Sequence, residues 1–216
     1  MQMPTASNLP GATIRSGNSS SISLLGEAVS SAVRIRYMTA GAAILTLFGA
    51  WWCLQALAQW STHPSWSIPA GIATTVTLLG LCVLRLSATR KMPRFRDPVA
   101  AAKGKHAGML FGIIFGLEGV LIALCSALLT NHGLSPWIPT ATAGIVGLHF
   151  IPLARVFEVP LYYWTGSLAV LGALGCLLVH DAGTRQQWVG FCMSAVLWGT
   201  AGLLLLQMHR SQPVQV

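Results

Sequence analysis

The sequence predicts an all-α membrane protein, a bundle of six transmembrane helices with both termini in the cytoplasm. Of its 216 residues, 54% are hydrophobic and only 8% are charged, whereas soluble domains carry roughly 25% charged residues. Six apolar runs are each close to the length of about 20 residues that a helix needs to cross a bilayer. Because backbone groups in lipid must bond within their own segment, we expect these runs to be helices rather than strands.

The first 35 residues precede the apolar runs. Residues 1–22 are rich in Ser, Asn, Gly and Pro, and such a composition predicts a disordered cytoplasmic tail. In residues 23–35, apolar side chains recur at helical spacing from Leu24 to Val33, which predicts an amphipathic helix in the plane of the membrane interface. The alternative is a plain extension of the first spanning helix, and the sequence does not separate the two.

A single transmembrane domain is expected over residues 36–210, followed by a short cytoplasmic tail at 211–216. The predicted spans are 37–60, 66–86, 106–129, 137–156, 161–179 and 188–208.

The basic residues set the predicted orientation. When six helices alternate, every Lys and Arg except Arg185 falls on the side of the termini, and positive charge is retained in the cytoplasm. The net charge of +8 therefore needs no nucleic-acid partner. Instead, we expect the loop 87–105 to attract anionic lipid headgroups. The residues concerned are Arg90, Lys91, Arg94 and Arg96.

A weak internal repeat relates the predicted hairpins. Pro69 and Arg85 of the second span correspond to Pro139 and Arg155 of the fourth at one common offset. One interpretation is three parallel helical hairpins produced by duplication. We favour the other, physical convergence, because Trp, Pro and Arg each have a preferred depth in a membrane helix.

Glycines recur every fourth residue where the third span begins, at Gly104, Gly108, Gly112 and Gly116. A stripe without side chains lets another helix backbone approach closely, which is how membrane helices gain packing contact. We expect a partner helix from the same chain first, and a homo-oligomer as the alternative.

Glu118 and His149 are the strongest candidates for a functional site. Glu118 lies near the centre of the third span, where a carboxylate is costly and must face protein or trapped water. His149 lies on the antiparallel fourth span, within about two helical turns of the same depth. Such a pair could share a proton, bind a cation or relay protons. The alternative is a structural hydrogen bond between helices.

The predicted polar centre extends to four further residues. Pro152 cannot donate a backbone hydrogen bond, so it leaves the carbonyl of Leu148 free beside His149. Arg155 and Glu158 lie one turn apart and could pair. Tyr162, with the two aromatic residues after it, fits an aromatic belt at the membrane interface.

Other chemistry is not predicted. The five cysteines lie singly within apolar runs, where cysteine behaves as a small hydrophobe. No phosphate-binding loop, zinc motif or catalytic triad is recognisable, so we predict no catalytic residue, no metal and no cofactor, and an enzyme is the least favoured class.

The box from Gly147 through His149, Pro152 and Phe157 to Tyr163 resembles a segment of small bacterial integral-membrane proteins of uncharacterised families. The resemblance covers the fourth and fifth spans. It implies a multi-pass protein of the bacterial inner membrane, and it implies no activity. The leading hypothesis is a small-solute transporter or an ion- or proton-handling protein. The alternative is a non-catalytic membrane accessory or assembly protein.

Overall fold

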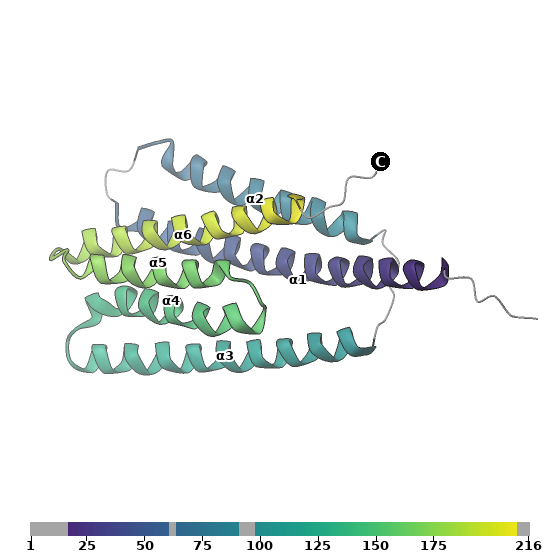
Figure 1. Cartoon of the computed structure of the whole chain (residues 1–216). Helices are drawn as coiled ribbons and strands as arrows, with labels where there is room; N and C mark the ends of the chain where they lie inside the picture. The colour runs from purple at the N-terminus through teal and green to yellow at the C-terminus, as the bar shows by residue number, and fades with distance from the viewer. Residues whose placement is uncertain (1–16, 61–63, 91–97, 211–216) are drawn as a thin grey trace, which may run out of the picture.

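A computed structural model describes residues 17–60, 64–90 and 98–210. Within these ranges the chain forms six α-helices and one short 3-10 helix, with no strand. The all-α class is therefore confirmed. Figure 1 shows the helices lying side by side, with α2 and α3 at opposite edges of the bundle.

The helices follow one another with short connections. Their bounds are α1 Gly17–Ala58, α2 Ser67–Arg90, α3 Pro98–Asn131, η1 Ser135–Trp137, α4 Ile138–Val156, α5 Leu161–Cys176 and α6 Ala182–Arg210. Gly133 allows the turn after α3 with a φ of 71°, a conformation that suits glycine. Asp181 caps α6, because its Oδ2 accepts a hydrogen bond of 2.7 Å from the backbone N–H of Thr184.

Five segments are long and apolar enough to cross a membrane: Tyr37–Ala58, Ser67–Ala88, Gly104–Asn131, Ser135–Val156 and Ala182–Met208. The fifth predicted span is shorter than expected. Helix α5 has 16 residues, or about 24 Å, and after Cys176 the amides of Leu177 to Val179 bond three residues back as single turns. A sixth crossing and the side on which the termini lie stay predictions.

Helix α1 is continuous from Gly17 to Ala58. The predicted boundary at residue 22 therefore lies inside a helix, and residues 23–35 continue into the spanning segment without a break. Their place in the membrane interface stays a prediction. The predicted tails at 1–16 and 211–216 lie outside the described residues.

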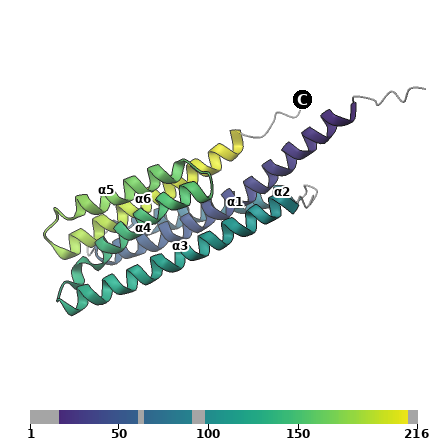
Figure 2. The ribbon, with the colours of Figure 1, turned by 60° about the horizontal axis from the view of Figure 1, so that its bottom comes forward.

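The helices pack in the spatial order α3, α4, α5, α6, α1, α2 (Figures 1 and 2). The turns from α3 to α4 and from α5 to α6 lie at one end, which we call the hairpin end. The neighbouring helices α4 and α5 are antiparallel, and so are α6 and α1, which pack side by side without being consecutive in the chain. An up-and-down bundle gives this pattern without duplication, so the packing does not separate the two interpretations of the repeat.

Small residues allow the closest helix contacts. A Cβ on Gly166 of α5 would lie 2.7 Å from the carbonyl oxygen of Gly147 on α4. Between α1 and α6, the Trp198 ring lies over Gly49, and its Nε1 donates a hydrogen bond of 3.1 Å to the Thr46 carbonyl. Close backbone approach of this kind is the main source of attraction between membrane helices.

The predicted glycine stripe does not serve packing within the chain along most of its length. A Cβ on Gly104 would meet the Tyr37 hydroxyl, but Gly108, Gly112 and Gly116 have no neighbour within 4 Å. The expectation of an intrachain partner is wrong for these three glycines. The physical reason is the position of α3 at the edge of the bundle, where it packs on α4 along one face and leaves the glycine face open.

Candidate functional site

A carboxyl group and an imidazole meet between α3 and α4. Glu118 Oε1 lies 3.2 Å from His149 Nδ1, and the two side chains are 7% and 14% exposed. Among the side chains of α3 that the structure describes, Glu118 alone is buried. Helix α3 therefore turns its one acidic group toward α4 and most of its apolar residues outward, as the high cost of a charge facing lipid requires.

The contact leaves hydrogen-bonding capacity unused. His149 Nδ1 is within ion-pair distance of the carboxylate but is not aligned for a hydrogen bond, and Glu118 Oε2 has no partner. Buried polar atoms are normally satisfied, so an unpartnered carboxylate oxygen indicates a place where a proton, a cation or water can bind.

One aromatic ring contacts His149, and a second aromatic contact joins α3 and α4 nearer the chain termini. The His149 ring lies 4.4 Å from the Phe150 ring. On the side toward the chain termini, Phe111 of α3 packs against Phe157, with 5.9 Å between ring centroids. An apolar surrounding makes it costly to leave a buried polar atom without a partner.

Pro152 interrupts the backbone hydrogen bonding of α4 one turn after His149. It lies inside α4 and has no N–H, so the carbonyl of Leu148, the residue before His149, receives no helical hydrogen bond from it. That this carbonyl serves as an acceptor for a ligand stays a prediction.

The other predicted members of the polar centre lie elsewhere. Arg155 does not pair with Glu158; its Nε donates to the Tyr163 hydroxyl at 3.3 Å. Glu158 is exposed, in a turn with a φ of 54°, which directs it away from the helix axis. Tyr162 is buried against Phe150 instead of lying in an interfacial belt, and its hydroxyl approaches Gly41 of α1.

The predicted lipid-binding loop lies largely outside the described residues. Lys91, Arg94 and Arg96 fall in the range 91–97, and the side chain of Arg90 is also not described. Among the residues that are described, no three His, Cys, Asp or Glu side chains gather closely enough to hold a metal ion.

Arg185 is a functional candidate that the sequence pattern alone does not reveal. It is 2% exposed and lies at the hairpin end. Its guanidinium donates to the carbonyls of Val179 at 3.0 Å and Pro136 at 3.1 Å and stacks 3.6 Å from the Trp137 ring centroid. The one signal in the sequence is that Arg185 is the only basic residue predicted on the side opposite the termini.

The chain is thus a helical bundle with a buried acid–imidazole pair between an edge helix and its neighbour. Comparison with known proteins finds no matching family model, no matching curated protein and no matching solved structure.

Proposed function

We propose that the protein is a multi-pass membrane protein that handles protons or cations, with Glu118 and His149 as the group that binds and releases the ion. One observation carries the proposal. The 3.2 Å contact between Glu118 Oε1 and His149 Nδ1 lies at the middle of the span Gly104–Asn131 and leaves Oε2 unpartnered.

The chemistry of the pair supports a proton carrier. A carboxylate beside an imidazole can hold one proton between them at no net charge, and a second proton or a cation makes the pair positive. In an apolar surrounding that second state is costly unless the ion leaves again or another group compensates it. On this proposal the Leu148 carbonyl, which receives no hydrogen bond from Pro152, helps to coordinate the cation.

The position of the pair at an edge helix supports movement. Most described side chains of α3 are exposed and only Glu118 is buried, so few contacts oppose a small displacement of α3 that changes access to the pair. On this proposal α5 also crosses the bilayer, and the termini lie in the cytoplasm, where the excess of positive charge places them.

Proton flux in proteoliposomes tests the proposal. The wild type, Glu118→Gln and Glu158→Gln are reconstituted, and flux is followed under an imposed pH gradient with and without candidate solutes. Glu158→Gln is the matched control, because it makes the same change at an exposed carboxylate. We expect flux in the wild type and control, and its loss in Glu118→Gln. Equal flux in all three proteins would refute the proposal, and a purely structural pair would lower only the stability of Glu118→Gln.

A second candidate function rests on a different observation. Gly108, Gly112 and Gly116 form an open stripe on α3 with no neighbour within 4 Å, and a close-approach surface on a membrane helix suits another helix. On this alternative the protein is a non-catalytic accessory or assembly protein, and the occupant is α3 of a second copy.

Substitution in the stripe distinguishes the alternative. Gly112→Leu fills open space, so it leaves the monomer stable but separates two copies. Gly80→Leu on α2, where a Cβ also meets nothing within 4 Å, is the control. Native mass spectrometry from bilayer discs should show dimers in the wild type and in Gly80→Leu, and monomers in Gly112→Leu. Wild-type monomers at all protein-to-lipid ratios would exclude this function.

A further inference from the structure

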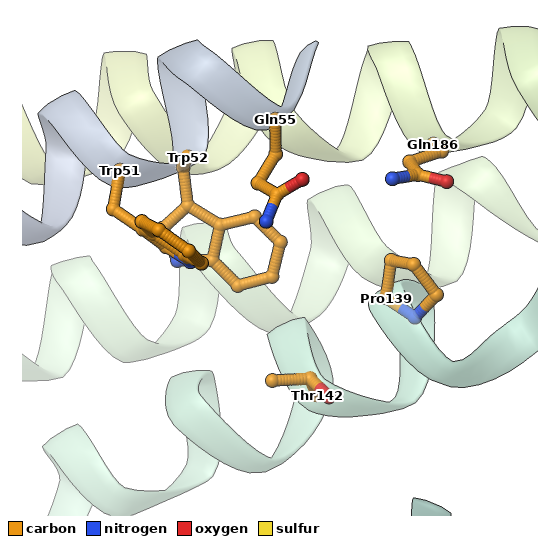
Figure 3. A pocket seen from close by; sticks show the side chains of 6 residues that line it. All are labelled: Trp51, Trp52, Gln55, Pro139, Thr142 and Gln186. Carbon is orange, nitrogen blue, oxygen red and sulfur yellow. The ribbon is translucent and has the colours of Figure 1, made fainter. Parts of the chain in front are cut away.

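A cavity lies near the hairpin end, between α1, α4 and α6. Its volume is about 180 Å³, and it is lined by Trp51, Trp52, Gln55, Pro139, Thr142 and Gln186. Figure 3 shows the two indole rings together at one side and the two carboxamides above Pro139 and Thr142. None of these residues belongs to the Glu118–His149 pair, so the cavity is a separate feature.

The size of the cavity matches a single ring. An apolar cavity of about 150 Å³ is large enough to hold benzene, and 180 Å³ leaves room for one or two polar substituents. The indole faces of Trp51 and Trp52 can stack on a flat ring. The carboxamides of Gln55 and Gln186 can donate to carbonyl or hydroxyl oxygens on that ring.

The charge near the cavity selects against a cationic ligand. No lining residue is acidic, and Arg185, next to Gln186 in the chain, is buried and, among the described residues, has no carboxylate in an ion pair. A buried guanidinium that is bound by carbonyls and by the Trp137 ring, with no carboxylate of the described residues in an ion pair with it, keeps its positive charge uncompensated and disfavours a second positive charge nearby. An ammonium group stacked on the two tryptophans is therefore disfavoured.

One wall of the cavity belongs to the exposed face of α1. Trp51 is 58% exposed and shares the outward face of α1 with Leu47 and Leu54, at positions i, i+4 and i+7. Gln55 lies three residues before the end of the span Tyr37–Ala58, or about 5 Å along the helix. The cavity thus lies near one end of this span, with the exposed Trp51 at its edge.

The walls are held in place by contacts outside the cavity. Arg185 fixes the start of α6 to η1, the short helix directly before α4, through the Pro136 carbonyl. Gly190 of α6 lies so close to α1 that a Cβ there would be 2.7 Å from the Trp52 carbonyl. A cavity whose walls come from three helices and are tied together in this way is preformed, which favours binding.

We propose that this cavity binds the head of a neutral, membrane-dissolved amphiphile that carries oxygen substituents on a single flat ring, as a quinone does. The ring stacks on the indoles, its oxygens accept hydrogen bonds from Gln55 and Gln186, and its hydrocarbon tail extends past the exposed Trp51.

Photolabelling of the full chain in proteoliposomes tests the proposal. The probe is an azido-benzoquinone with a decyl tail, and the competitors are the same quinone without the azide and decanol. We expect saturable labelling that maps to the α1 segment 51–55 and the α4 segment 139–142. The unlabelled quinone should abolish it, and decanol should leave it unchanged.

Variants separate the ring site from general partition into lipid. The double variant Gln55→Leu/Gln186→Leu lacks both amide donors, so its apparent affinity for the quinone probe should fall by at least about tenfold. Gln59→Leu, an exposed amide outside the cavity, should leave it unchanged. If the double variant does not fold, Thr142→Leu fills the same space and should abolish labelling. Labelling that does not saturate, that decanol removes, or that these cavity variants leave intact would overturn the proposal.

Discussion

Gly166→Ala should destabilise the bundle although alanine is the better helix former. The new Cβ would lie 2.7 Å from the Gly147 carbonyl oxygen and 3.2 Å from the Phe150 Cβ. The first neighbour is backbone, so α4 and α5 must separate by several tenths of an ångström. Overpacking of this kind costs about 1–3 kcal/mol, and the gain in helix propensity offsets about 0.5–1 kcal/mol of it. We expect a net loss of about 1–2 kcal/mol.

Gly175→Ala is the matched control for that prediction, because it lies on the same helix and a Cβ there meets nothing within 4 Å. Unfolding of both variants by a denaturing detergent, followed by circular dichroism, measures the difference. Gly175→Ala should equal or exceed the wild type in stability. A Gly166→Ala protein as stable as Gly175→Ala would show that α4 and α5 do not approach as closely as described.

Three further predictions concern the helix contacts and the hairpin end. Arg185→Met should lower the stability by about 2–3 kcal/mol, because it removes charged hydrogen bonds, and amide exchange in residues 179–186 should become faster. Arg155→Met, at an exposed position, is the control and should change the stability by less than about 0.5 kcal/mol. Equal exchange rates in the two variants would contradict the prediction. The cap from the Thr184 N–H lowers the pKa of Asp181 below its ordinary value of 3.8, so its stabilisation is complete above that value and is lost as pH falls through the lowered pKa. The wild type should therefore lose stability relative to Asp181→Asn only in acid, and a pH-independent difference in melting temperature would argue against the cap. Trp198→Phe removes the bond to the Thr46 carbonyl but keeps a ring over Gly49, so it should cost about 1 kcal/mol, measured by the same detergent unfolding; no loss would mean that the indole N–H contributes nothing.

The all-α fold and the depth of each side chain along its helix could be predicted from the sequence, because both follow from local rules. Apolar length identifies a membrane helix, and a fixed rise per residue assigns each side chain a depth. Glu118 and His149 could thus be placed at similar depth on adjacent helices. The length of α5 could not be predicted, because Leu177–Val179 are as apolar as the helix before them and only their hydrogen bonds end it.

The direction in which a helix face points was not predictable, because it depends on which helices become neighbours. The glycine spacing from Gly104 to Gly116 indicates that close approach is possible but does not name a partner, and α3 at the edge leaves most of it open. The close contact between Gly147 and Gly166 forms between isolated glycines that show no pattern. The burial of Arg185 depends on Pro136, 49 positions away in the chain.

The most direct test of the proposed ion-binding pair is an infrared difference spectrum of the reconstituted protein between acid and alkaline conditions. If Glu118 exchanges a proton inside the membrane, the wild type and Glu158→Gln will show a carboxyl C=O band from a group shielded from water. The band will be absent in Glu118→Gln. A wild-type spectrum without any band that depends on Glu118, at every pH at which the protein stays folded, would contradict the proposal.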